Sequence, residues 1–159
     1  WITSRGLGDV YKRQVEEKPE FWNSMTESLL FRFPVTVYYE DTDITGVVYH
    51  ANYLKYCERA RSEILGAERL YQIHQQENLS FVVYRAEMNF RRGAVLGDRL
   101  EVQTQPTLTS PYRVQFLQNI VHSSDQQLLV KAVIELVCIR QEKPVPVPDW
   151  IQDHLPTSD

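Results

Sequence analysis

The chain contains little cysteine and no excess of basic charge, and each shortage excludes a class of protein. Cys57 and Cys138 are its only two cysteines. They are too few for a disulfide framework, which favours a reduced, cytoplasmic setting. A net charge of −4 argues against nucleic acid as the main partner, because phosphate binding needs a basic face. No run of apolar residues is long enough to span a bilayer, so we expect no membrane span.

The sequence also lacks the motifs of common metal and cofactor sites. No cysteine–histidine cluster has zinc spacing, and there is no glycine-rich phosphate loop. Asp41, Asp43 and Gly46 imitate the opening of a calcium-binding loop. The twelfth position of such a loop requires a bidentate glutamate, and here it is Asn52. We therefore expect neither a metal nor a cofactor.

The first residues do not fit a folded domain. Residues 1–14 have no helical or strand period, and they lack the apolar region and cleavage site of a signal peptide. Their segment GLGDVYKRQ resembles adapter-derived sequence at the ends of predicted reading frames, which makes Met25 the expected native start. A native disordered extension is the alternative. We expect residues 1–26 to be a non-native or disordered extension.

Strand and helix periods follow in turn along the rest of the chain. Residues 31–40 alternate at period two, with Pro34 near the start, as in an edge strand or a strand beginning. Residues 49–64 place apolar side chains at helical spacing up to Gly66, which predicts one amphipathic helix. A shorter helix is expected over residues 67–76. Four charged residues of the long helix are expected to face away from its apolar stripe: Glu58, Arg59, Arg61 and Glu63.

Strand patterns dominate the second half of the chain. They lie at residues 80–90, 99–105, 112–122 and 128–140. Turn residues between them, such as Gly93 and Gly97, predict an antiparallel meander. The last strand is apolar on both faces, as in a central, covered strand. We expect one domain over residues 27–141, followed by a proline-rich tail over residues 142–159.

The predicted class is α+β, with one long helix against a curled antiparallel sheet of about five strands. The helix must bury its apolar stripe against one face of that sheet. A single helix covers only part of such a face. Self-association is a reasonable way to cover the remainder.

The densest polar chemistry lies in residues 38–52, YYEDTDITGVVYHAN. Glu40, Asp41 and Asp43 stand between a predicted strand and the start of the long helix, and Gly46 frees the backbone for close approach to a ligand. A helix start presents unpaired N–H groups and a partial positive charge, which can hold a developing oxyanion. A carboxylate facing these groups would act as base or nucleophile, which suits acyl-transfer hydrolysis.

These residues also have structural explanations, which the sequence leaves open. Asp41 or Asp43 could cap the helix or the turn. His50 could be an ordinary residue of the first helical turn. Arg91 and Arg92, at the end of a predicted strand, could form a solvated edge or bind the phosphates of a coenzyme.

The run YYEDTDITGVVYHANYLKYCERAR strongly resembles the signature of the hydroxybenzoyl-CoA thioesterase family. It is most similar to the YbgC-type branch, the acyl-CoA thioesterases associated with the Tol-Pal system of Gram-negative bacteria. The resemblance covers residues 30–140. It implies a hotdog fold, in which the sheet wraps around the long helix, and homodimers or homotetramers with sites at the subunit interface. It also implies an acyl-CoA substrate, with an acyl-carrier protein as the alternative donor.

The resemblance assigns roles to individual residues. The family's catalytic carboxylate is the second aspartate of an E-D-x-D run, which is Asp43 here, acting as nucleophile or general base. The N–H that polarises the thioester carbonyl belongs to the first helical turn, at His50. Tyr49 and Asn52 match the surrounding pattern and are expected to shape the substrate site.

One departure from the branch and two rival functions stay open. Ile44 and Thr45 stand where close members carry small residues, which would narrow or reshape the loop. The first rival is a hydratase or dehydratase of acyl thioesters, with His50 and Asp43 as acid and base. The second is a non-catalytic acyl-carrier or envelope-complex interaction module.

Overall fold

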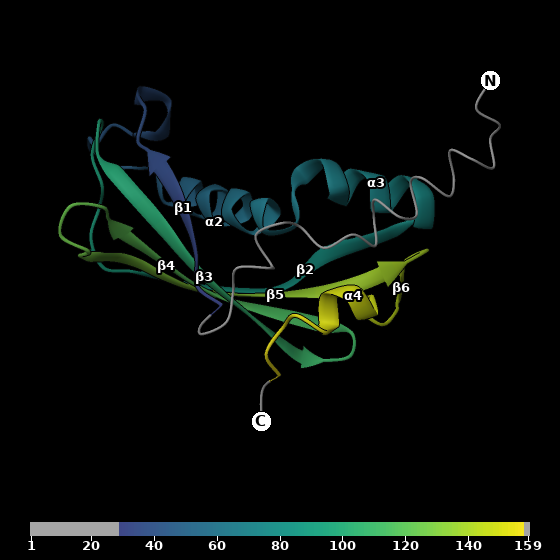
Figure 1. Ribbon diagram of the computed structural model, residues 1–159. Coiled ribbons are helices and arrows are strands. Elements are labelled where there is room, and N and C mark those ends of the chain that lie inside the picture. Colours follow the sequence, from purple (N-terminus) through teal and green to yellow (C-terminus); the bar gives the residue numbers. More distant parts are fainter. Residues whose placement is uncertain (1–28, 158–159) are drawn as a thin grey trace, which may run out of the picture.

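The computed structural model describes residues 29–157, which form a curled antiparallel sheet with helices packed against it (Figure 1). The elements in chain order are β1 (Phe31–Thr36), a 3-10 turn (Tyr39–Asp41), α2 (His50–Leu65), α3 (Ala67–Glu77), β2 (Leu79–Phe90), β3 (Arg99–Ser110), β4 (Arg113–His122), β5 (Leu128–Arg140), β6 (Lys143–Pro144) and α4 (Asp149–Gln152). The predicted α+β class, with one long helix against about five strands, is confirmed. The extension predicted for residues 1–26 lies outside the described residues. No helix in the described part of the chain is long and apolar enough to cross a membrane.

The strands follow the order β1-β3-β4-β5-β2, and β6 pairs with the end of β5. β3, β4 and β5 form the predicted meander. The prediction that β2 precedes β3 in this meander was wrong, because β2 pairs with β5, from Leu79 opposite Arg140 to Phe90 opposite Val130. Residues 91–98 therefore cross the sheet instead of forming a hairpin. Turn residues mark where a strand ends and say nothing about its partner.

The first strand is shorter than predicted. β1 ends at Thr36 instead of Glu40, and Tyr39, which lies within the predicted strand, is 82% exposed. The chain leaves the strand because the Asp41 carboxylate accepts a hydrogen bond from the Tyr38 N–H at 2.8 Å and closes a 3-10 turn. β1 is an edge strand that pairs with β3, in agreement with the proline near its start.

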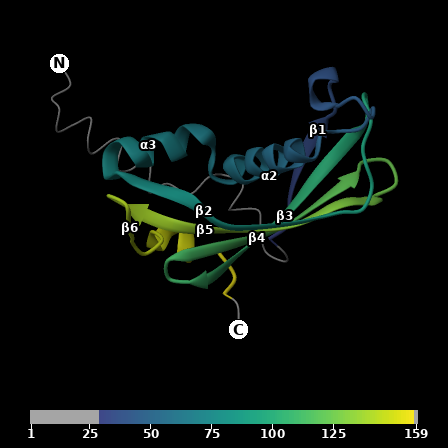
Figure 2. The same ribbon diagram turned by 180° about the vertical axis from the view of Figure 1, so that it is seen from behind.

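The long amphipathic helix α2 begins at His50 and ends before Gly66, as predicted. Figure 2 shows α2 and α3 on the same side of the sheet. Four residues of the predicted apolar stripe are buried: Tyr53, Cys57, Ala60 and Ile64. Tyr49, which was expected to begin that stripe, precedes the helix and is 47% exposed.

Arg61 was predicted to face away from the apolar stripe, and this prediction was wrong, because the residue is only 8% exposed. Its guanidinium donates a hydrogen bond to Gln118 Oε1 at 3.0 Å. The Gln118 amide in turn donates to the Cys57 carbonyl at 3.0 Å and to Thr104 Oγ1 at 2.9 Å. Burial lowers the pKa of the Arg61 guanidinium. This network links α2 to β3 and β4, and it gives the buried polar groups the partners they need.

The C-terminal segment packs against the sheet and against α3. The Val147 N–H donates to the Pro111 carbonyl at 2.8 Å. The Arg69 guanidinium of α3 lies 5.2 Å from the centre of the Trp150 ring. Three apolar side chains of the segment are buried: Val147, Ile151 and Leu155. The segment therefore closes one end of the space between the sheet and the helices.

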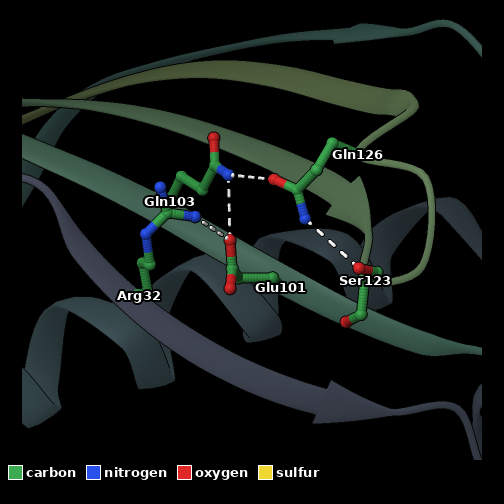
Figure 3. Close-up of polar contacts among 5 residues, drawn as sticks. All are labelled: Arg32, Glu101, Gln103, Ser123 and Gln126. Carbon is green, nitrogen blue, oxygen red and sulfur yellow. Dashed lines mark hydrogen bonds and ion pairs between the residues drawn. The ribbon is translucent and has the colours of Figure 1, made fainter.

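The outer face of the sheet carries polar side chains on β1 and β3 (Figure 3). Arg32 and Glu101 form an ion pair at 2.5 Å. The Gln103 amide donates to Glu101 at 2.9 Å and to Gln126 at 2.8 Å, and Gln126 donates to the Ser123 carbonyl at 3.3 Å. Exposed pairs of this kind contribute roughly 0–1 kcal/mol each. The apolar interior of this part of the protein therefore lies on the opposite face, under α2.

Candidate active site

A tight loop between β1 and α2 carries Asp43. The Asp43 N–H donates to the Val47 carbonyl and the Gly46 N–H donates to the Asp43 carbonyl, each at 3.0 Å. Gly46 has a φ of +81°, and a Cβ there would meet no atom of the described residues within 4 Å. Glycine is therefore required by the backbone conformation of the turn. Ile44, at the tip, is fully exposed.

The loop is fixed to the segment that joins β2 to β3. The Val48 N–H donates to the Ala94 carbonyl at 2.8 Å, and Val47 and Val95 form an isolated β-bridge. A Cβ on Gly93 would lie 2.9 Å from Val47 Cγ1, so a larger residue there would push the two segments apart. The position of the loop therefore depends on residues far along the chain.

Asp41 and Asn52 hold the loop to the start of α2. The Asp41 carbonyl accepts hydrogen bonds from the Tyr49 N–H at 2.8 Å and from Asn52 Nδ2 at 2.9 Å. Both Asp41 and Asn52 are buried. The Asp41 carboxylate accepts the Tyr38 N–H and the Asp43 carboxylate accepts the Thr45 N–H, so the explanation as a turn cap fits both aspartates, whereas neither side chain caps α2. Asn52 is a candidate substrate residue, and its amide donates to the Asp41 carbonyl. Tyr49, the other candidate, directly precedes His50 and has an exposed side chain.

The Asp43 carboxylate is held by Thr45 and is partly exposed. Asp43 Oδ1 accepts hydrogen bonds from the Thr45 N–H at 2.8 Å and from Thr45 Oγ1 at 2.5 Å. These hydrogen bonds, with a smaller contribution from the nearby His50, lower the pKa of the Asp43 carboxyl. Asp43 is therefore ionised at neutral pH. Oδ2 has no hydrogen-bond partner among the residues that the structure describes.

The start of α2 leaves two backbone donors unused. No side chain caps this helix, and the Asn52 N–H bonds back to the Tyr49 carbonyl at 2.8 Å. Within residues 29–157, neither the His50 N–H nor the Ala51 N–H has an acceptor. Together with the helix dipole, these two groups form a site for negative charge.

Aromatic rings surround this helix start. The His50 ring lies 4.5 Å from the Tyr49 ring and 6.3 Å from the Phe90 ring, measured between centres. The Tyr53 ring lies 5.9 Å from Phe90, and the Tyr53 hydroxyl accepts the Ala94 N–H at 2.9 Å. Sequence reasoning missed Phe90, because a half-exposed aromatic at a strand end gives no signal of its partner.

Arg91 and Arg92 follow Phe90 directly, so the structure brings both arginines to the same end of α2. Their N–H groups bond to the Leu129 carbonyl at 2.7 and 3.2 Å. Both residues are exposed, and neither guanidinium forms an ion pair with any described residue. They are therefore free to bind an anionic ligand near His50.

The cysteines are poor candidates for the nucleophile. Cys57 and Cys138 are both buried and unpaired. Burial raises the pKa of the Cys57 thiol to about 12 and that of Cys138 to about 11. A cysteine nucleophile needs a low pKa and access to substrate. Among residues 29–157, no three His, Cys, Asp or Glu side chains gather closely enough to hold a metal ion.

Comparison with known proteins connects this site to thioesterases. The family model described as the thioesterase-like superfamily matches residues 37–155, which include the Asp43 loop and every element after β1. The acyl-CoA thioester hydrolase YbgC of Escherichia coli O157:H7 is 43% identical over 114 residues, covering 69% of this chain and 82% of that protein. The acyl-CoA thioesterase YbgC of Haemophilus influenzae is 38% identical over 119 residues, covering 74% and 86%.

A solved structure extends the similarity to the fold. The crystal structure of a 1,4-dihydroxy-2-naphthoyl-CoA thioesterase from Synechocystis matches this chain with a TM-score of 0.74 at 31% identity. The match covers 79% of this chain and 95% of that protein. Sequence and fold therefore point to the same group of proteins.

Proposed function

Since the chain belongs to the thioesterase-like superfamily, as a YbgC-type hotdog thioesterase, we propose that it hydrolyses acyl-CoA thioesters to the free acid and CoA. One observation carries the proposal. An ionised carboxylate with a free oxygen, on Asp43, stands near a helix start with two unused N–H groups. This is the combination of carboxylate and oxyanion donor that thioester hydrolysis needs.

The proposed reaction places the thioester carbonyl against the first turn of α2. The N–H groups of His50 and Ala51 donate to the carbonyl oxygen as it becomes an oxyanion, and the helix dipole adds to this stabilisation. The rings of Tyr49 and Phe90 both lie close to the His50 ring, so they would border the reacting carbonyl.

Asp43 supplies the second half of the chemistry by one of two routes. In the first, a carboxylate oxygen attacks the thioester carbon, the C–S bond breaks, CoA leaves as the thiolate, and water hydrolyses the mixed anhydride. In the second, Asp43 takes a proton from a water molecule whose oxygen attacks the same carbon. Both routes give the acid and CoA, and both need Asp43 ionised.

Arg91 and Arg92 are the proposed contacts for the phosphates of CoA. Both guanidiniums are exposed beside Phe90, and arginine binds phosphate through paired, charge-assisted hydrogen bonds. The two buried, unpaired cysteines support a reducing, cytoplasmic setting for the enzyme.

A thiol-release assay tests the proposed function directly. Free CoA would be followed with a thiol-reactive dye on acetyl-, butanoyl-, dodecanoyl- and benzoyl-CoA, with an acyl-carrier-protein thioester in parallel. We expect CoA release from at least one acyl-CoA. Release from the carrier-protein thioester alone would change the donor, and no release from any thioester would overturn the proposal.

The hydrogen bonds to Asp43 predict a measurable pH dependence. Because they lower the pKa of Asp43 below its ordinary value of 3.8, kcat/KM should stay high until the pH falls below that value. Thr45→Val removes the largest of these hydrogen bonds, so the pKa should rise and the acid limb should move to higher pH. Thr45→Ser keeps the hydroxyl and should leave the limb in place. An acid limb that stays fixed in Thr45→Val would contradict this role.

We propose that a second copy of the chain covers the free edge of β2. β2 is the last strand of the sheet. Four large hydrophobic residues along it are between 41% and 61% exposed: Val82, Val83, Tyr84 and Phe90. A long, apolar, unpaired edge strand is a template for pairing with another chain. A homodimer formed through this edge would bring the His50 region to the subunit interface, and a homotetramer would need a further contact.

A charge on β2 should weaken the proposed dimer. The exposed run of β2 has Ala86 near its centre, so in an antiparallel pairing two Ala86→Lys side chains would face each other. We expect the dimer dissociation constant to rise by roughly ten-fold or more. Sedimentation velocity would measure it, with Gln127→Lys in the β4–β5 turn as the charge-matched control. Equal effects of the two variants would contradict the β2 interface.

A further inference from the structure

A cavity of about 320 Å³ lies under the second half of α2. Its walls come from α2, α3, the start of β2, the β3–β4 hairpin, β5 and the C-terminal segment. Most of the inner wall is apolar and buried, including Ile64, Ile73, Val114, Phe116 and Ile151. Three residues that line it are exposed: Glu58 of α2, His74 of α3 and Val83 of β2. The cavity therefore opens between the two helices and β2, along the free edge of that strand.

The polar side chains that line the cavity all have hydrogen-bond partners within the protein: Glu58, Arg61, Ser62, His74 and Ser80. Glu58 accepts the Ser62 hydroxyl at 2.8 Å, and Arg61 donates to Gln118 at 3.0 Å. A ligand in this cavity therefore meets mainly apolar surface. An aliphatic chain suits such a wall, because a polar group buried there would lose hydrogen bonds to water.

The cavity is separated from the Asp43 loop and from the start of α2 in its own protomer. His50 is at the start of α2, and Glu58, the first residue of α2 that lines the cavity, is eight residues later, which is about 12 Å along the helix axis. Tyr53 and Tyr56, 2% and 1% exposed, fill the concave face between them. An acyl group bound at Asp43 would have to run along the first half of α2, past these two buried rings, to reach the cavity of the same chain.

The proposed β2 pairing brings the start of α2 of the partner subunit close to the opening of the cavity. β2 has a bulge between Val83 and Arg85. If two β2 strands pair antiparallel about Ala86, Phe81, which lines the cavity, therefore lies opposite Phe90 of the partner subunit. Arg85 and Glu87, which form an ion pair within each chain, then lie opposite Glu87 and Arg85 of the partner subunit, so the pairing places charges of opposite sign against each other. Within one chain the His50 ring packs against Phe90. The opening would therefore be about one strand spacing, roughly 5 Å between backbones, from Phe90 of the partner subunit. The partner's His50 packs against that residue.

We infer that this cavity receives the far end of an aliphatic acyl chain whose thioester is bound at Asp43 and His50 of the partner subunit. The inference rests on the proposed function and names its substrate class, medium- and long-chain aliphatic acyl-CoA. The C-terminal segment then helps to set the accepted length, because Ile151 and Leu155 form part of the cavity wall.

The dependence of activity on chain length gives the first test. Acyl groups too short to pass the opening should share one low kcat/KM. Beyond that length, kcat/KM should rise by about four-fold for each methylene that enters the cavity. A series of even-numbered saturated acyl-CoAs from acetyl to hexadecanoyl would show this break. A profile that is flat or falls with length would overturn the inference.

Filling the cavity gives the second test. Leu70 of α3 lines it and Tyr71, the next residue, is exposed outside it. Leu70→Trp should lower the ratio of dodecanoyl- to butanoyl-CoA kcat/KM by ten-fold or more, and Tyr71→Trp should leave the ratio as in the wild type. Leu136→Phe, which fills the cavity from β5, is the second variant should Leu70→Trp fail to fold.

Mixed dimers decide whether the cavity serves the partner's catalytic site. One chain would carry Asp43→Ala with an open cavity, and the other an intact Asp43 with Leu70→Trp. The chains would be coexpressed with different tags and purified through both. In the mixed dimer, the intact Asp43 faces the open cavity of the other chain, so dodecanoyl-CoA hydrolysis should recover to about half the wild-type rate per dimer. Neither homodimer should reach this rate.

The outcomes separate this inference from the proposed function. Hydrolysis of acyl-CoA without recovery in the mixed dimer would overturn the cavity as a site for the partner's substrate and leave the thioesterase intact. Loss of the chain-length break only in the cavity variants supports the inference. Absence of CoA release from every acyl-CoA would overturn the proposed function itself.

Discussion

Asp43→Asn is expected to lower kcat on a good acyl-CoA substrate by roughly 10³-fold or more, the upper part of the range for loss of an acid–base group. The amide keeps the shape of the side chain and can still accept the Thr45 hydrogen bonds. It lacks the negatively charged carboxylate, which either attacks the thioester carbon or takes a proton from water. Because this loss is felt in the transition state, KM should change far less than kcat.

Two neighbouring carboxylates provide the controls for Asp43→Asn. Glu40 is exposed in the same region, so Glu40→Gln should keep near-normal kcat. Asp41 is buried and its carboxylate accepts the Tyr38 N–H, so Asp41→Asn should lower stability as well as activity. Unfolding curves for all three variants would separate a lost catalytic group from a damaged loop.

Near-normal turnover by Asp43→Asn would remove Asp43 from the mechanism. Loss of turnover does not by itself exclude a hydratase, which would also use Asp43 and His50. An enoyl-CoA hydration assay, following loss of the conjugated thioester, separates the two. Water addition without CoA release would replace the thioesterase by the hydratase.

The local part of the site could be predicted from sequence, because the chemistry and the elements are neighbours in the chain. A strand period, a turn-rich loop and a helical period follow one another within residues 31–64. A helix start must leave N–H groups unpaired. These features place Asp43 before the first turn of α2 without any long-range information. The separate roles of Asp41 and Asp43 could not be predicted, because each could cap a turn.

The contacts between segments far apart in the chain could not be predicted, because turn residues do not indicate which strand a given strand pairs with. The pairing of β2 with β5 puts β2 at the free edge. The same crossing brings Phe90 to His50 and sets Gly93 against Val47. Nothing in the period of residues 80–90 distinguishes an edge strand from an inner one. The proposed dimer interface along β2 could therefore be inferred only from the strand order of the sheet.

Arg61 shows where the polar pattern of a helix gives the wrong answer. Arginine is rarely buried without a partner, so its exposure was the reasonable expectation. The partner is Gln118, on a strand far along the chain, and its amide also bonds to Thr104 and to the Cys57 carbonyl. In the sequence, Gln118 stands at period two between Phe116 and Ile120, and a polar residue at such a position is a signal that could have indicated the network.

This network leads to the largest stability effect that we expect. Gln118 is fully buried and is the acceptor for the Arg61 guanidinium. Gln118→Ala would leave a buried cation without that acceptor and Thr104 without its donor. We expect a loss of about 3 kcal/mol or more in the free energy of unfolding, because a buried charge stripped of its partner keeps its desolvation cost.

Gln115 of the same strand has no side-chain hydrogen bond to any described residue and lies on the other face, so it provides the matched control. Gln115→Ala should change the free energy of unfolding by about 0.5 kcal/mol or less. Urea unfolding would be compared at one protein concentration, because dimerisation adds to apparent stability.

The double variant Arg61→Met with Gln118→Leu separates two causes of instability. One is the loss of the hydrogen-bond acceptor of Arg61, and the other is the loss of packed side-chain volume at Gln118. If the cost of Gln118→Ala comes mainly from the stranded guanidinium, replacing both groups by apolar side chains of similar length should recover most of the stability. The double variant should then be more stable than Gln118→Leu alone. Additive losses in the two single variants would mean that Arg61 and Gln118 contribute separately, and that burial of the arginine is offset by contacts other than this hydrogen bond.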